Sequence, residues 1–171
     1  MQKPKGTYDM YGSDSEVFLY FNKIIESLMD KYNYKYFNTP IFELSEVFHR
    51  GVGETTDIVS KETYDFVDRG GRNITLRPEG TAGLARCLIE NKLYAEQLPL
   101  KAWYMGPMFR YERPQSGRNR QFTQFGLEVY GIEDASIDAE VISTARSTGM
   151  QMYFGLCLYF LFREKIIFCS N

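Results

Sequence analysis

The chain has 171 residues, enough for one domain with a sizeable hydrophobic core. Its formal net charge is −2, which argues against a protein that coats nucleic acid, because phosphate contacts on that scale demand a basic excess. Cys87, Cys157 and Cys169 are far apart and lack CxxC spacing, so the sequence predicts neither a disulfide framework nor a zinc site. These cysteines and a polar N-terminus predict a cytoplasmic protein without a secretory signal or membrane segment.

The N-terminal third begins with an amphipathic pattern. Apolar residues at helical spacing predict a helix over Ser15–Tyr32, with Ser13 or Ser15 as its N-cap. The aromatic stretch Tyr34–Glu43 follows and favours a strand, in which Pro40 marks an edge or a break because it cannot donate to a ladder. A helix that leads into an edge strand is typical of an interface element.

A loop and a hairpin come next. The segment Arg50–Asp65 is rich in glycine and charge, which predicts an exposed loop. Tyr64–Val67 and Asn73–Leu76 favour strands, and the turn residues Asp68–Arg72 between them indicate a hairpin.

A second helix and two long strands complete the central part. The pattern predicts a helix from Arg77 to about Asn91, with Thr81 as its cap. Strands are predicted over Leu100–Tyr111 and Gln121–Gly131, joined by a basic tip at 112–120. A third helix is expected to begin near position 136 or 138.

Strand alternation divides the second long strand into two faces. One face is apolar and suits a core; it carries Thr123, Phe125, Leu127 and Val129. The other face mixes polar and aromatic groups: Phe122, Gln124, Gly126, Glu128 and Tyr130. This second face resembles a ligand floor, in which Gly126 leaves a depression and Gln124 and Glu128 flank it about 13 Å apart. The alternative is a solvent-exposed mixed face.

Cations cluster on the first strand and the tip. Arg110 projects from a strand, so its guanidinium is fixed and suits a phosphate or carboxylate. Arg113, Arg118 and Arg120 add charge at the tip, for which polyphosphate and RNA backbone are both plausible partners. The alternative is a solvated basic turn.

Glu79 stands at the start of the second helix. The helix dipole favours a carboxylate there, and that carboxylate can still accept a hydrogen bond from a ligand amine. The alternative is a purely structural first-turn acid.

Several motifs together resemble histidyl-tRNA synthetases, a class II family. Residues 109–122 and 124–131 read FRYERPQSGRNRQF and QFGLEVYG, which is similar to motif 2 of that family. Leu76–Ala82 resembles its amino-acid-binding loop, Lys5–Asp9 its N-terminal signature, and the stretch from Glu54 to Tyr64 its insertion ahead of the active site. The resemblance covers residues 3–143.

The resemblance implies an α+β fold with a class II synthetase-like antiparallel sheet flanked by helices, here incomplete. Residues 1–143 are expected to form a partial catalytic core with motifs 1 and 2, and 144–171 an atypical tail. The family also implies a homodimer through the first helix and the Tyr34–Phe42 strand. Its reaction is a histidine–tRNA ligation, in which histidine and ATP give histidyl-adenylate and the histidyl group then passes to tRNA(His).

The resemblance also implies roles for single residues. Arg110 is the implied catalytic residue and contacts both the ATP α-phosphate and the histidine carboxylate. The other implied ATP-binding residues are Glu112, Arg118 and Phe122, with Phe122 stacked on adenine. The implied histidine-binding residues are Glu79, Gly80, Thr81, Gln124 and Glu128, of which Glu128 accepts from the imidazole. Mg²⁺ would bridge the phosphates, and no protein-bound metal is predicted.

Two departures from the family pattern stand out. Thr123 replaces a histidine, on the core face where little effect is expected. After about Ser143 the resemblance ends, and the chain contains neither motif 3 nor an anticodon-binding domain. A truncated chain is therefore expected, which by itself does not form histidyl-adenylate at a useful rate.

Two other interpretations compete. One is the synthetase-like regulatory subunit of ATP phosphoribosyltransferase in histidine biosynthesis, a binding module without aminoacylation. The other is a dimerisation or folding unit with an empty ligand face. Arg77–Thr81 and the intact arginine-rich tip favour the enzyme lineage.

Overall fold

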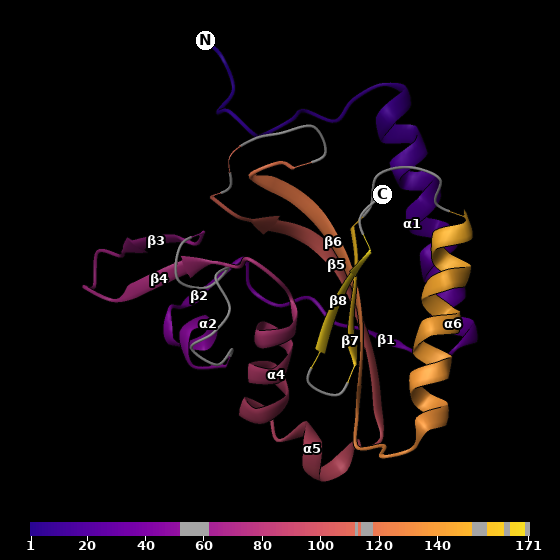
Figure 1. The fold of residues 1–171 in the computed structure, drawn as a ribbon. Coiled ribbons are helices and arrows are strands. Elements are labelled where there is room, and N and C mark those ends of the chain that lie inside the picture. The colour runs from indigo at the N-terminus through magenta and orange to yellow at the C-terminus, as the bar shows by residue number, and fades with distance from the viewer. Residues whose placement is uncertain (52–61, 112, 114–117, 152–156, 163–164, 170–171) are drawn as a thin grey trace. The chain divides into compact units, whose positions relative to one another are not determined.

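The computed structural model describes residues 1–51, 62–111, 113, 118–151, 157–162 and 165–169 (Figure 1). Its helices are α1 (Ser13–Lys31), α2 (Glu46–Gly51), α4 (Thr81–Glu90), α5 (Leu93–Glu96) and α6 (Ala135–Gln151). Its strands are β1 (Lys35–Tyr36), β2 (Phe42–Leu44), β3 (Tyr64–Val67), β4 (Asn73–Leu76), β5 (Leu100–Phe109), β6 (Gln121–Tyr130), β7 (Cys157–Phe162) and β8 (Lys165–Cys169). The predicted α+β class is confirmed. None of the described helices is both long and apolar enough to cross a membrane.

The chain divides into two compact units, and β5 and β6 each run through both. The first unit comprises Met1–Tyr8, Asn38–Leu93 and Gly106–Gln124, and the second comprises the remaining residues. One sheet has the strand order β1-β5-β6-β7-β8, with β1 parallel to β5. The other has the order β2-β4-β3 and is antiparallel throughout. The larger sheet is therefore mixed, because its edge strand β1 runs parallel to β5.

The predicted strand over Tyr34–Glu43 is split at its proline. Lys35–Tyr36 pairs with β5, whereas Phe42–Leu44 belongs to the small sheet. Pro40 lies between the two segments, as expected of a residue that cannot donate to a ladder. Both segments are edge strands.

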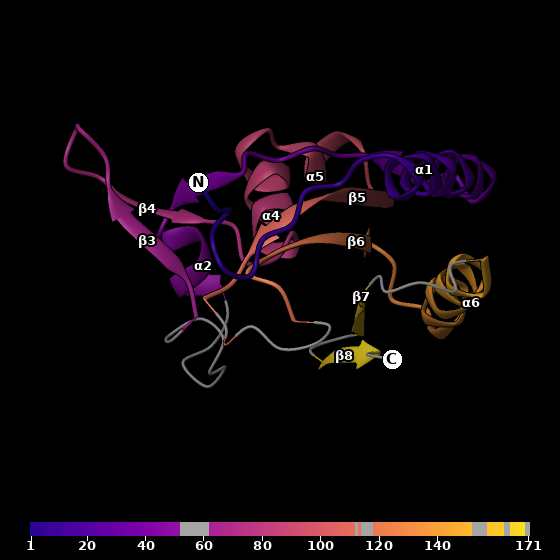
Figure 2. The same ribbon diagram turned by 90° about the horizontal axis from the view of Figure 1, so that it is seen from above.

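The core of the second unit lies where α1 and α6 run side by side (Figures 1 and 2). Its buried members come from α1, β5, β6 and α6 and from the segment after α1: Ile25, Met29, Tyr34, Trp103, Phe125, Leu127, Val141 and Ala145. Each large apolar side chain buried in this way contributes about 1.5–3 kcal/mol. Phe125 and Leu127 thus confirm the core face that alternation predicts for β6.

Helix α1 begins at Ser13, before the position that either predicted cap requires. Its N-cap is Gly12, and no side chain caps the helix. Ser13 is already helical, and the Ser15 hydroxyl donates to the Gly12 carbonyl at 2.8 Å. The prediction of a serine cap was therefore wrong, because both hydroxyls lie inside the helix, where such local bonds back to the main chain are available.

The small sheet of the first unit carries its polar side chains on one face. Register aligns Glu43, Thr75 and Asp65 on that face, where Thr75 is fully buried. Arg86 of α4 binds Glu43 at 2.6 Å, which ties the helix to this face. The opposite face carries Phe42 and other apolar residues, of which Phe42, Leu44 and Phe66 are exposed by 58, 43 and 46%. An exposed apolar face of this kind is typical of an interaction surface.

A tyrosine ring fills the space over Gly126. A Cβ built on Gly126 would lie 2.7 Å from Tyr104 Cε1 and closer still to Cζ and the hydroxyl oxygen. The depression that the missing side chain leaves is therefore occupied by Tyr104, and the interpretation of an open hollow at this point was wrong.

Gly126→Ala is expected to lower the free energy of unfolding by about 1–3 kcal/mol, because the added methyl overpacks a buried strand. Denaturant unfolding measures the change. Tyr104→Ala in the same chain removes the clashing ring, so the double variant should lose less than the sum of the two single losses. Strict additivity would contradict the close packing of Tyr104 on Gly126.

Candidate functional site

Arg110 directly follows β5 and is held inside the first unit. Its side chain is only 6% exposed, and its Nε donates to the Pro78 carbonyl at 3.0 Å. Its backbone N–H donates to the Arg120 carbonyl at 2.9 Å. A guanidinium fixed at both its backbone and its Nε presents its planar donors in one orientation, which suits bidentate binding of phosphate or carboxylate.

Phe122 of β6 lies under this guanidinium. The guanidinium carbon of Arg110 is 5.1 Å from the ring centroid of Phe122, which is a cation–π distance. Phe122 is half-buried, so part of its ring is accessible. A cation and an aromatic face in contact fit the two ends of a nucleotide, its phosphates and its base.

The turn before α4 carries the next predicted group. Glu79 accepts hydrogen bonds from the backbone N–H of Thr81 at 2.5 Å and of Ala82 at 2.9 Å. The N-cap is the buried Gly80, so Thr81 is not the cap that the sequence predicted. Glu79 takes over the capping because its longer side chain reaches forward to the first helical N–H groups. A carboxylate has about four acceptor sites, so capacity remains for a ligand amine.

Gln124 is the most deeply buried of the predicted ligand residues. Its side chain is 1% exposed, and within the described part of the chain nothing donates a hydrogen bond to its Oε1. A buried amide oxygen without a donor costs about 1–3 kcal/mol, so it is a natural acceptor for a ligand N–H.

Glu128 lies on the same strand within the second unit and is also buried. The burial of Gln124 and Glu128 excludes the alternative that this face of β6 is solvent-exposed. Two polar side chains buried on one strand require partners, which a ligand or the protein can supply.

The tip between the long strands is only partly described. Arg118 is exposed, and the Arg120 guanidinium lies 4.3 Å from the Tyr111 ring centroid. Glu112 lies outside the described residues, so its predicted role remains a prediction.

Arg77 is a structural residue that the sequence did not single out. It is buried, its Nε donates to the Pro107 carbonyl at 2.9 Å, and its Nη1 donates to the Thr39 carbonyl at 2.7 Å. A Cβ on Gly106 would collide with this guanidinium. No local sequence pattern predicts this role, because the hydrogen-bond partners of Arg77 lie about thirty or more positions away in the chain.

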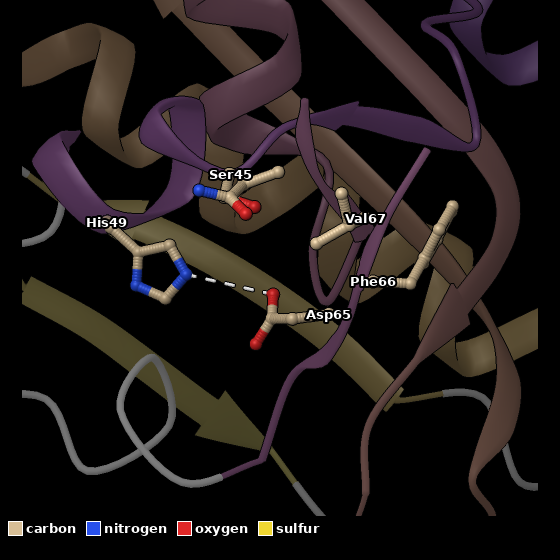
Figure 3. Close-up of a pocket in the computed structure, with 6 residues that line it drawn as sticks. Ser45, His49, Asp65, Phe66 and Val67 are labelled. Atoms are coloured by element: carbon tan, nitrogen blue, oxygen red, sulfur yellow. Dashed lines mark ion pairs between the residues drawn. The ribbon is translucent and has the colours of Figure 1, made fainter. Parts of the chain in front are cut away.

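A second polar cluster lines a hollow of about 400 Å³ beside the small sheet (Figure 3). His49 points toward Asp65, with Nε2 and Oδ1 3.8 Å apart. Thr63 and Thr75 donate to the two Asp65 oxygens at 2.6 and 2.5 Å, and Ser45 lies 2.8 Å from the Thr75 hydroxyl. These groups satisfy one another's hydrogen-bonding capacity, so the cluster is best explained as structural support for the hairpin.

Partial burial would raise the pKa of Asp65, but the hydrogen bonds from Thr63 and Thr75 and the neighbouring His49 hold that pKa below its ordinary value. Because the folded pKa is depressed, the ionised carboxylate stabilises the fold above the unfolded pKa of about 3.9. This stabilisation is lost as the pH falls through the folded value.

Thr75→Val is expected to lower the free energy of unfolding by about 1–2 kcal/mol at pH 7, since a hydrogen bond to a charged group is lost. The deficit should shrink as the pH falls through the depressed pKa of Asp65. Denaturant unfolding at a series of acidic pH values measures this deficit in the free energy of unfolding. Thr148→Val is the control: Thr148 is also buried, but it donates to the Thr144 carbonyl, so its deficit should not depend on pH. Equal pH dependence of the two variants would contradict the assignment.

Known proteins give the decisive comparison. The histidyl-tRNA synthetase family profile matches residues 6–156. The chain belongs to the histidyl-tRNA synthetase family. A histidine--tRNA ligase from Lactococcus lactis subsp. cremoris (strain SK11) is 51% identical over 154 residues, which are 89% of this chain and 36% of that relative. The chain thus spans about a third of the length of the curated relatives it matches.

Solved structures agree with this family assignment. Apo histidyl-tRNA synthetase from S. aureus superposes with a TM-score of 0.75 at 40% identity, over 90% of this chain and 35% of that one. A Bacillus halodurans C protein described as an ATP phosphoribosyltransferase regulatory subunit/histidyl-tRNA synthetase gives a TM-score of 0.72 at 25% identity, over 86% and 37% of the two chains. The chain is more identical to the curated histidine--tRNA ligases than to this regulatory-subunit protein, so the comparisons do not favour the regulatory-subunit alternative.

Proposed function

We propose that this chain supplies an ATP- and histidine-binding half-site of a histidine–tRNA ligase. The reaction is activation of histidine by ATP to histidyl-adenylate, followed by transfer to tRNA(His). The observation that carries the proposal is the geometry of Arg110. Its buried guanidinium donates to the Pro78 carbonyl and lies on the Phe122 ring, and both Arg110 and Phe122 belong to the segment that resembles motif 2 of the family.

Arg110 is the proposed catalytic residue. Its donors bind the α-phosphate of ATP and the carboxylate of histidine, which brings the two reacting groups together. Negative charge grows on the α-phosphate during attack. A cation that is already oriented toward this group stabilises the growing charge without reorganisation. The hydrogen bond from Nε to Pro78 maintains this orientation.

Phe122 is proposed to stack on adenine, with Glu112 and Arg118 contacting the nucleotide. The half-buried ring of Phe122 beside Arg110 supports this arrangement. Arg118 is exposed to solvent, which supports a contact with phosphate or RNA.

Gln124 and Glu128 are proposed to bind histidine, with Glu128 accepting from the imidazole. Glu79, Gly80 and Thr81 are proposed to take its α-amino group. The buried Gln124 Oε1, which lacks a donor within the described residues, supports an N–H-bearing ligand. A site that pairs a polar ring in this way discriminates strongly against apolar analogues.

Mg²⁺ belongs to the proposal only as the counter-ion of the ATP phosphates. Among the described residues no three His, Cys, Asp or Glu side chains lie together as metal ligands. No step is assigned to a metal held by the protein.

A cytoplasmic homodimer is the proposed assembly, with the second copy on α1 and the Tyr34–Phe42 segment. Each of these carries exposed apolar side chains: Val17, Leu19 and Tyr20 on α1, and Tyr36, Ile41 and Phe42 on the segment. Apolar surface of this kind is stabilised by burial in an interface.

Arg110→Lys is expected to weaken ATP binding at least about tenfold, because an ammonium cannot reproduce the fixed fork of a guanidinium. Isothermal titration of the purified chain with ATP and magnesium measures the affinity. Arg72→Lys is the matched control, since Arg72 is an exposed hairpin residue paired with Asp68. Equal affinities for the two variants, or no ATP binding by the unaltered chain, would refute the role of Arg110.

Phe42→Ser is expected to raise the dimer dissociation constant by about tenfold or more, as loss of a large apolar contact costs roughly 1.4 kcal/mol or more. Sedimentation velocity over a concentration series measures it. Tyr94→Ser, at a similarly exposed aromatic outside the proposed interface, should leave the constant unchanged. A chain that stays monomeric at all concentrations would contradict the dimer.

A further inference from the structure

A short N-terminal turn closes on the base of the tip that carries Arg120. Within Pro4–Thr7, the Thr7 N–H and hydroxyl both donate to the Pro4 carbonyl, at 3.2 and 2.7 Å. The Gly6 carbonyl in turn accepts the backbone N–H of Arg120 at 2.7 Å and of Gln121 at 3.2 Å. The turn therefore holds Arg120 and the first residue of β6, Gln121, through main-chain bonds.

Arg120 connects this turn to Arg110. The Arg120 N–H donates to Gly6, and its carbonyl accepts the Arg110 N–H at 2.9 Å. Both backbone polar groups of Arg120 are therefore hydrogen-bonded. Its N–H binds the N-terminal turn, and its carbonyl binds Arg110, the candidate phosphate-binding residue. The Arg120 side chain is fixed as well, with its guanidinium 4.3 Å from the Tyr111 ring. The backbone position of Arg110 thus depends on where Gly6 holds Arg120.

Gly6 is at this point for two reasons. Its φ is +83°, a conformation that side chains disfavour. A Cβ there would lie 2.8 Å from Arg120 Cγ and 3.1 Å from the Arg120 backbone nitrogen, so the main chain of Arg120 would have to move. Gly71 has a similar φ of +78° but no atom within 4 Å of its built Cβ. The close approach to Arg120 distinguishes Gly6 from Gly71, although both have a positive φ.

We propose that Gly6 is a positioning residue for Arg110, acting through the backbone of Arg120. This inference rests on the proposed ATP-binding role of Arg110. Gly6 touches no substrate; it sets the place of the residue that accepts the Arg110 N–H. A displacement of a few tenths of an ångström passes from Arg120 to Arg110, and misplacement of a binding group by about 1 Å can cost about 100-fold in rate.

Gly6→Ala and Gly71→Ala separate positioning from backbone strain. Both introduce an alanine at positive φ, so both should lower the denaturation midpoint. Only Gly6→Ala should weaken binding of ATP with magnesium, by about five- to tenfold in calorimetry, while Gly71→Ala keeps the affinity within about twofold. Equal ATP affinities in the two folded variants would overturn the proposal.

A double-variant cycle tests whether Gly6 acts through Arg110. In the Arg110→Lys background, Gly6→Ala should add less than about a twofold loss, because the geometry that it disturbs no longer matters. The full five- to tenfold loss in that background would overturn the proposal and leave the role of Arg110 intact. If Arg110→Lys itself does not weaken ATP binding, the proposed function fails, and the inference falls with it.

Thr7→Val provides a second variant should Gly6→Ala fail to fold. It removes the hydroxyl bond to Pro4 and leaves Gly6 unchanged. A two- to threefold weaker ATP affinity, absent in the Arg110→Lys background, supports positioning by the turn. An unchanged affinity in the otherwise unaltered chain would overturn it.

Discussion

The fixed guanidinium of Arg110 is the interaction on which the candidate site depends. Its Nε is bound by the Pro78 carbonyl, and Phe122 supplies an aromatic face beneath it. Desolvating a cation is costly unless its donors are matched, and the Pro78 carbonyl supplies a backbone partner for this buried guanidinium. Pro78 belongs to the turn that also places Glu79, which means that one turn orients the cation and the carboxylate together.

Buried polar groups distinguish the candidate ligand-binding site of this chain from its apolar core. Ile25, Met29 and Phe125 pack in the second unit as apolar residues should. Gln124, by contrast, is as buried as those residues, and its Oε1 has no donor within the described part of the chain. Retaining such a group in the interior lowers stability, which is a common cost of a binding site.

The sequence predicts features whose causes are local and misses those whose partners are distant. The β3–β4 hairpin was predicted to the residue, because the turn chemistry of Asp68–Arg72 lies between two β-favouring segments. The role of Arg77, and the Tyr104 ring that fills the space over Gly126, could not be predicted, since they depend on pairings across the fold. Arg110 and Gln124 were identified through alternation and family resemblance, but their depth of burial depends on residues packed against them from elsewhere in the fold.

A crystal structure of the chain with ATP would locate the nucleotide. If Arg110 binds the phosphate, the α-phosphate will lie within hydrogen-bond distance of the Arg110 guanidinium, with adenine stacked on Phe122 and the bond from Nε to Pro78 retained. ATP bound elsewhere, for instance in the hollow beside His49 and Asp65, would refute this role of Arg110. So would a nucleotide whose phosphates contact only the exposed Arg118.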